Sequence, residues 1–117
     1  MRLLHIITPV KDSIDLTLQT IESVLASSAQ VPMQYTVYND FSTPENSARL
    51  AEAAARMGFE LVNLSELTDH PSPNYLLVLQ TAQQRAITAE AALVIVESDV
   101  VVKPHTLQAL FEGAQQQ

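Results

Sequence analysis

The 117-residue sequence has no cysteine and only two glycines, Gly58 and Gly113. Without cysteine the chain can form neither disulfides nor thiolate metal sites, and it is compatible with a reducing compartment. Two isolated glycines cannot form the glycine-rich loops whose backbone amides bind phosphates, so the dinucleotide-binding fingerprint and the Walker loop are both absent. A phosphate ligand of this chain would therefore need another source of positive charge.

Positive charge is also scarce, because six Lys and Arg stand against 13 Asp and Glu and the net charge is −7. The basic residues are scattered, whereas a nucleic-acid-binding surface requires clustered positive charge. We therefore expect neither DNA nor RNA as a partner. An acidic protein can still bind an anionic ligand when a divalent cation lies between the two.

Long hydrophobic runs are missing as well. The apolar opening of the chain is short and runs into Thr8-Pro9 without a small-residue cleavage site, so it predicts a strand and not a signal peptide. No apolar stretch approaches the ~20 residues that span a bilayer. We expect no membrane segment in this chain and a cytoplasmic location, with membrane association left open for a longer protein.

Apolar residues nevertheless make up 47% of the sequence and charged residues only 16%, which favours one globular domain over residues 1–117. Apolar runs predict strands at residues 3–8, 33–39, 59–64 and 91–96. The last run has six apolar residues in succession and is typical of a strand buried on both faces.

A helical pattern follows each strand. The first helix carries an apolar stripe over Ile14–Leu25, with Asp12 and Ser13 as candidate caps. The second begins at Thr43-Pro44 and stops at Gly58, since proline suits the first helical position and glycine the position after the last.

The third helix follows Ser72-Pro73, which repeats the cap-then-proline signal, and Asn74 is a further candidate cap. Its predicted apolar stripe runs through Leu76, Leu79, Ala82 and Ala86 and ends near residue 89. The fourth helix begins at Pro104.

This alternation predicts an α/β fold with three layers, in which a parallel sheet has helices on both faces. Right-handed crossovers leave few strand orders, and the Rossmann-like order 3-2-1-4 is the commonest for this start. Ligands bind where the winding reverses, outside the carboxyl ends of the strands. Thr8-Pro9-Val10, Asp40 and Glu97-Ser98-Asp99 are the segments expected there.

Two carboxylates close the fourth strand, at Glu97 and Asp99. At this spacing both can reach one hard cation, and Mg²⁺ or Mn²⁺ prefers oxygen ligands and keeps room for substrate phosphates. The alternative is a solvated turn. Asp40, after the second strand, can accept a hydrogen bond from a base or ribose, or it can cap the turn into Thr43-Pro44. His5 is expected to be a packed core residue, because the three histidines lack metal-ligand spacing.

Five segments of the chain carry a resemblance to a known family, and they follow one another in the same order. They are Ile6-Ile7-Thr8-Pro9-Val10-Lys11, Thr20-Ile21-Glu22-Ser23-Val24-Leu25, Val37-Tyr38-Asn39-Asp40-Phe41-Ser42-Thr43, Asn74 with the helix after it, and Val94-Ile95-Val96-Glu97-Ser98-Asp99 followed by Pro104-His105-Thr106-Leu107. Together they resemble the amino-terminal, nucleotide-sugar-binding half of glycosyltransferase family 2, which has the GT-A fold. The resemblance covers nearly the whole chain.

The resemblance implies a role for each candidate residue. Asp40 would bind the nucleobase, most often uracil, and Thr8 and Pro9 would line the nucleoside pocket. Asp99 would coordinate a divalent ion, Mn²⁺ or Mg²⁺, on the diphosphate of a nucleotide sugar. Glu97 would assist the metal or the ribose, and Ser98 would contact the nucleotide.

The resemblance also implies what this chain does not contain. The family's second half carries the general base and the site for the acceptor, a glycan or lipid-linked glycan. We therefore expect a fragment of a hexosyltransferase-type enzyme that is inactive alone, with an exposed edge that favours a homodimer. The chain also departs from the family at Phe41 and near Tyr75, where glycine is usual, at Glu97, where aspartate is commoner, and at Gln84, where asparagine is frequent.

Three other classes of protein share parts of this pattern. A phosphorelay receiver needs an acidic pair after strand 1 and an aspartate after strand 3, where this chain has Thr8-Pro9-Val10 and Asn63-Leu64-Ser65. A nucleotidyltransferase would carry a glycine-rich basic loop after strand 1. A non-catalytic interaction domain with a decayed site suits the missing glycines, but Asp40 and Asp99 are intact.

Overall fold

The computed structural model describes residues 3–27, 29 and 31–115. Its parallel sheet has the strand order β3-β2-β1-β4, which confirms the predicted order. The strands are β1 (Leu3–Val10), β2 (Met33–Asn39), β3 (Glu60–Asn63) and β4 (Ala91–Ile95). The helices are α1 (Ile14–Leu25), α2 (Pro44–Met57), α3 (Tyr75–Thr88) and α4 (Thr106–Gln115), and a short 3₁₀ turn, η1 (Leu64–Glu66), precedes α3.

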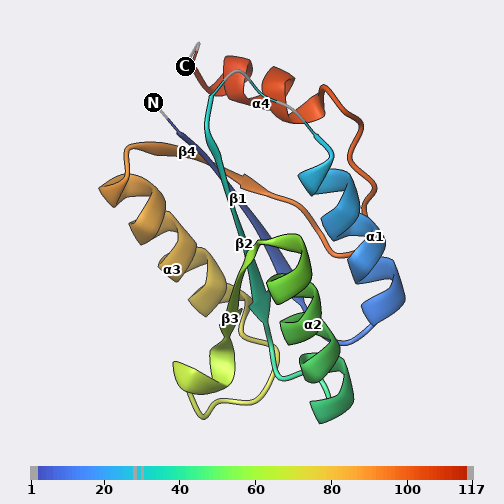
Figure 1. Ribbon diagram of the computed structural model, residues 1–117. Helices are drawn as coiled ribbons and strands as arrows, with labels where there is room; N and C mark the ends of the chain where they lie inside the picture. Colours follow the sequence, from blue (N-terminus) through green and yellow to red (C-terminus); the bar gives the residue numbers. More distant parts are fainter. Residues whose placement is uncertain (1–2, 28, 30, 116–117) are drawn as a thin grey trace.

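Helices cover both faces of the sheet, as predicted (Figure 1). The larger core lies between one face and α1, α2 and α4, and it includes Leu4, Ile6, Val10, Ile21, Val24, Val37, Leu50 and Leu107. The smaller core lies between the other face and α3 and consists of Ile7, Tyr38, Leu64, Val78 and Ala82. Burial of each large apolar side chain stabilises the fold by roughly 1.5–3 kcal/mol, so both faces contribute.

The predicted ends of α2 are confirmed. Thr43 is the N-cap, and its hydroxyl accepts a hydrogen bond from Asn46 N at 3.2 Å, while Pro44 occupies the first helical position. Gly58 ends the helix with a φ of 85°, in the left-handed region that glycine adopts without steric cost.

Of the two predicted caps of α1, Ser13 does occupy the N-cap position, but it makes no side-chain cap hydrogen bond. The Asp12 carboxylate instead accepts from Thr43 N at 2.8 Å and from Asn46 Nδ2 at 3.0 Å, so it binds the start of α2. A short polar side chain at a helix start can serve a neighbouring loop that the local sequence does not reveal.

The start of α3 differs in part from the prediction. Asn74 occupies the N-cap position, as predicted, but makes no side-chain cap hydrogen bond, and Ser72 and Pro73 precede the helix. The buried row of α3 is Val78, Ala82 and Ala86, which confirms the two predicted alanines, whereas the predicted Leu76 is 67% exposed. The three buried residues are spaced four apart and therefore lie on one face of the helix. Two of them are alanine, and these small side chains allow α3 to lie close to the sheet.

Two strands deviate from their predicted form. β1 continues through Pro9 to Val10. Proline is tolerated there because β4, in the described residues, pairs with β1 only as far as Ile7, so the missing Pro9 N–H faces an unpaired side. β4 is not buried on both faces, and Ile95 is 38% exposed. The reason is that β4 lies at the edge of the sheet.

Candidate functional site

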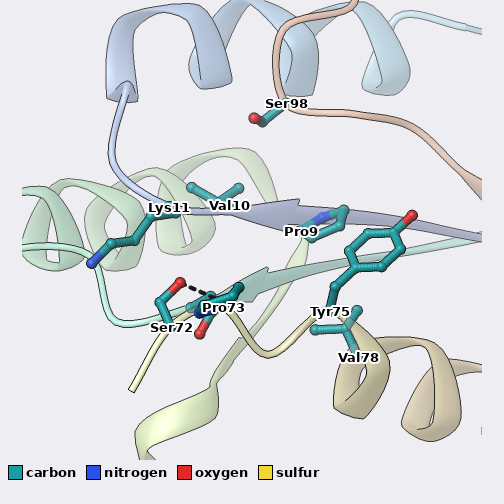
Figure 2. Close-up of a pocket in the computed structure, with 9 residues that line it drawn as sticks. Pro9, Val10, Lys11, Ser72, Pro73, Tyr75, Val78 and Ser98 are labelled. Atoms are coloured by element: carbon teal, nitrogen blue, oxygen red, sulfur yellow. Dashed lines mark hydrogen bonds between the residues drawn. The ribbon is translucent and has the colours of Figure 1, made fainter. Parts of the chain in front are cut away.

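A cavity of about 370 Å³ lies at the carboxyl ends of β1, β2 and β4. It is lined by Pro9, Val10, Lys11, Asp40, Ser72, Pro73, Tyr75, Val78 and Ser98 (Figure 2). This volume lies within the roughly 300–1,000 Å³ range of small-molecule sites. The cavity occupies the switch point at which the sequence predicted a site.

The strand order brings the predicted polar residues together. β1 lies between β2 and β4, so the segments that follow β2 and β4 lie on either side of the carboxyl end of β1. Asp40, directly after β2, and Ser98, shortly after β4, therefore line the same cavity, and Pro9 lies between them on β1. Three of the predicted nucleotide-contacting residues converge on one hollow.

Thr8 does not reach this cavity. Its side chain is fully buried on the opposite face of the sheet, where the Thr8 hydroxyl and the Tyr35 hydroxyl share a hydrogen bond of 2.7 Å. Burial raises the pKa of Tyr35 to about 12, against the opposing effect of this bond. The Thr8 side chain is covered and bound to Tyr35, so it does not reach the cavity, whereas Pro9 and Val10 at the end of β1 both line it.

Asp40 is 8% exposed and its carboxylate is held by the protein. Oδ2 accepts from Ser72 Oγ at 2.9 Å and from Asn74 N at 2.8 Å, and Oδ1 accepts from Asn74 Nδ2 at 2.8 Å. Burial alone would raise the pKa of Asp40, but these hydrogen bonds and the charge of Lys11 outweigh it and lower the pKa below its ordinary value. Asp40 therefore carries its negative charge into the cavity at neutral pH.

Asn74 is held in turn by His70. The Asn74 side chain donates to the His70 carbonyl at 2.9 Å, and its Oδ1 lies 3.2 Å from His70 Nδ1. These contacts fix the orientation of the amide, so that Nδ2 faces Asp40. Ser72 was predicted only as a cap, and Asn74 as a cap or a ligand contact, because their partner Asp40 lies 32 and 34 residues away and no local pattern signals it.

The Glu97-Ser98-Asp99 segment forms a turn after β4, and α1 holds it in place. The Thr20 hydroxyl donates to the Ser98 carbonyl at 2.9 Å, and Ser23 Oγ accepts from Val102 N at 2.9 Å. Two residues of the first-helix signature thus bind the segment that carries the carboxylates. The backbone of this segment forms a turn, and the side chains of Glu97 and Asp99 are exposed to solvent.

Tyr75 links α3 to this turn. Its hydroxyl donates to Glu97 Oε1 at 3.4 Å, and its ring, 44% exposed, lines the cavity (Figure 2). Partial desolvation and the negative charge of Glu97 raise the pKa of Tyr75. Sequence reasoning missed Tyr75 as a site residue because its partner Glu97 lies 22 residues away and no local pattern signals the contact.

Lys11 is the second cavity residue that sequence reasoning missed. It follows β1 directly. Its amine donates to the Phe41 carbonyl, and the amine nitrogen lies 3.8 Å from Asp12 Oδ2.

Three residues near this cavity have a left-handed backbone. Asp12, Ser13 and Phe41 have φ values of 55°, 50° and 60°, a region that costs non-glycine residues energy. The position of Phe41 therefore favours glycine, which the resemblance also expects there.

The donor set restricts which metal could bind. In the part of the chain that the structure describes, no group of three or more His, Asp or Glu side chains could enclose an ion. Two exposed carboxylates, Glu97 and Asp99, follow β4. This set does not fit a cage made of protein alone, but it fits Mg²⁺ or Mn²⁺, which use one or two carboxylates and take their other ligands from water and phosphate.

None of the helices in the described residues combines the length and apolar character needed to cross a bilayer.

No protein-family profile and no curated protein matches the sequence. Solved structures do match the fold. S. aureus TarS 1-349 superposes with a TM-score of 0.61 at 15% identity, over 99% of this chain and 33% of its own. The mannosyltransferase PcManGT from Pyrobaculum calidifontis, in complex with GDP-Man and Mn²⁺, has a TM-score of 0.61 at 20% identity, over 92% of this chain and 30% of its own.

The same TarS fragment has also been solved with UDP-GlcNAc, and it gives 15% identity and a TM-score of 0.61 over 99% of this chain. At these identities the comparison establishes a shared glycosyltransferase-like α/β fold. The chain spans about a third of the length of these TarS 1-349 and PcManGT chains.

Proposed function

We propose that this chain is the donor-binding part of a glycosyltransferase and that it binds a uridine diphosphate sugar together with Mn²⁺ or Mg²⁺. One observation carries the proposal: Asp40 and Ser98, from the ends of two different strands, line one cavity of about 370 Å³ with the carboxylates of Glu97 and Asp99 on the adjoining turn. The fold-level likeness to proteins solved with UDP-GlcNAc and with GDP-Man and Mn²⁺ supports it.

Each residue has a proposed role that its position supports. Asp40 accepts a hydrogen bond from the base, and Pro9 forms the apolar floor beneath the nucleoside. Ser98 contacts the diphosphate, and Asp99 and Glu97 hold the metal, with Tyr75 orienting Glu97. Thr8 acts indirectly, since its hydroxyl supports Tyr35 on the far face of the sheet.

The metal explains how an acidic chain binds an anionic donor. A divalent ion neutralises charge that develops on a departing diphosphate, as a Lewis acid. In this proposal the chain contributes to hexosyl transfer by holding the nucleotide, and the acceptor is a glycan or lipid-linked glycan. The general base is not among the residues assigned, so we expect this chain alone to bind nucleotide without transferring sugar at a normal rate.

Isothermal titration calorimetry with UDP and Mn²⁺ tests the proposal. We expect UDP to bind the wild type only with the metal, and the Asp99→Ala variant to bind at least about tenfold more weakly, which is the scale of losing a metal contact. Glu66→Ala is the matched control, because it removes an exposed carboxylate of η1 instead of one on the turn after β4. Equal binding with and without Mn²⁺, or in wild type and Asp99→Ala, would refute the metal assignment.

A non-catalytic α/β interaction domain is the second candidate, favoured by one observation. The Asp40 carboxylate already accepts three hydrogen bonds from the protein, which would stabilise the loops without any ligand. If neither UDP nor another nucleoside diphosphate binds in the same titration, this structural role for Asp40 replaces the proposed one.

A further inference from the structure

Most of the acceptor capacity of Asp40 is used by the protein. An ionised carboxylate has about four positions at which it accepts hydrogen bonds, two on each oxygen. Ser72 Oγ and Asn74 N occupy both positions on Oδ2, and Asn74 Nδ2 occupies one position on Oδ1. One position therefore remains open, on Oδ1.

The two donors from Asn74 are fixed in place. Asn74 is 8% exposed, and its backbone N–H belongs to the N-cap of α3. Its side-chain amide is also bound to the carbonyl and ring of His70, so it cannot rotate away without losing these contacts. The Ser72 hydroxyl, in contrast, is half-buried at the cavity and is a single rotatable donor.

Nucleobases differ in the number of donors on the edge that a carboxylate would bind. Uracil presents one imide N–H between two carbonyl oxygens, whereas guanine presents a ring N–H and an amino group side by side. Two parallel donors fit a carboxylate with both oxygens open. The fold itself does not decide between these bases, because it is shared by proteins solved with UDP-GlcNAc and with GDP-Man.

We propose that Ser72 and Asn74 are specificity-determining residues, which fill three acceptor positions of Asp40 so that the site selects uridine over guanosine nucleotides. This inference rests on the proposed function. Uracil satisfies the one open position with its one N–H. Guanine would leave a donor without a partner or would displace Ser72, and an unmade hydrogen bond of this kind weakens binding by about tenfold or more.

Competition between UDP and GDP, each titrated with Mn²⁺ by calorimetry, tests the inference. We expect the wild type to prefer UDP by about tenfold. The Ser72→Ala variant opens a position on Oδ2, so the affinity for GDP should rise relative to the affinity for UDP, and the preference should fall to about threefold or less. Ser72→Thr retains a hydroxyl donor and should keep the wild-type preference.

The control variant is Ser65→Ala, an exposed serine of η1 outside the cavity lining, and it should leave both affinities unchanged. A purely structural role for Ser72 would weaken both nucleotides in parallel, so the ratio of the two dissociation constants separates the two roles. UDP binding with an unchanged ratio in Ser72→Ala, or a wild-type preference for GDP, would overturn the inference and leave the proposed function standing. Failure of the wild type to bind either nucleotide would overturn both.

Discussion

Asn74 binds Asp40 twice, with its backbone N–H donating to Oδ2 and its side-chain Nδ2 donating to Oδ1, each at 2.8 Å. The two residues are 34 positions apart, so these bonds join the end of β2 to the start of α3. Asp40 is therefore a structural residue and a candidate ligand-binding residue at once. Its two roles can be separated by measuring stability and binding in the same variant.

Asp40→Asn should weaken both properties. The amide nitrogen of the new side chain would face a donor from Asn74, and the negative charge would be lost. We expect the free energy of unfolding, measured by urea denaturation, to fall by about 1–3 kcal/mol. UDP binding in the presence of Mn²⁺ should fall at least about tenfold. Asp69→Asn, which changes an exposed carboxylate in the loop between η1 and α3, is the control. A variant with normal stability and normal binding would show that neither role exists.

Stability should depend on pH through Asp40 and Glu60. Hydrogen bonds from Arg85 lower the pKa of Glu60, and hydrogen bonds from Asn74 and Ser72 lower the pKa of Asp40 despite its burial. A carboxyl whose pKa is lower in the folded state stabilises the fold above its unfolded pKa of about 4 and loses this contribution as the pH falls through the folded pKa. We expect the Tm to drop between about pH 5 and pH 2, and to drop less in Asp40→Asn. A Tm that rises on acidification would contradict this sign.

Much of this fold is encoded in local pattern. β2 runs over Met33–Asn39 and α1 over Ile14–Leu25, as predicted, because apolar period and turn residues mark both. α2 is equally clear, since Thr43 and Gly58 specify its ends through backbone chemistry within a few residues. The strand order then follows from the handedness of the connections.

The site was only partly predictable, for a physical reason. Strand ends and topology indicate where Asp40 and Ser98 meet, but contacts such as Ser72 with Asp40 and Tyr75 with Glu97 depend on how distant loops fold over the sheet. Thr8 is a further example, because its hydrogen bond to Tyr35 joins residues 27 positions apart and no local pattern shows it.

A polar network lies on the α3 face, toward the opposite end of that helix from the cavity. Arg85 donates to both oxygens of Glu60 at 2.9 and 2.8 Å, and Glu60 also accepts from Thr36 at 2.7 Å. The Thr36 hydroxyl donates its proton to Glu60, so it accepts from His5 Nε2 at 3.2 Å. Desolvation, together with the charge of Arg85, lowers the pKa of His5, which keeps the ring neutral inside the sheet. His5 is thus a core residue, as predicted.

Arg85→Met should test this network apart from the cavity. Arg85 is partly exposed, so solvent screens the pair, and we expect the free energy of unfolding to fall by only about 1 kcal/mol. Nucleotide affinity should stay unchanged, because Arg85 lies near the end of α3 and Tyr75 at its start. The control is Arg56→Met, which breaks an exposed pair with Glu52 within α2 and should change stability by less than about 0.5 kcal/mol. Loss of nucleotide binding in Arg85→Met would mean that the network reaches the cavity.

The turn from α3 into β4 should be improvable by one substitution. Glu90 has a φ of 55° just after the end of α3, in the conformation that Gly58, with a φ of 85°, adopts after α2. The left-handed conformation costs a non-glycine residue roughly 1–2 kcal/mol, and the Glu90 side chain is exposed, so its removal loses no core packing. Glycine has a more flexible unfolded state, which offsets part of the stability gained by removing the strain at Glu90.

We therefore expect Glu90→Gly to raise the free energy of unfolding by about 0.5–1 kcal/mol in urea denaturation. Glu112→Gly, in the interior of α4, should instead lower it by about 1 kcal/mol, and a loss of stability in both variants would mean that the turn is not strained.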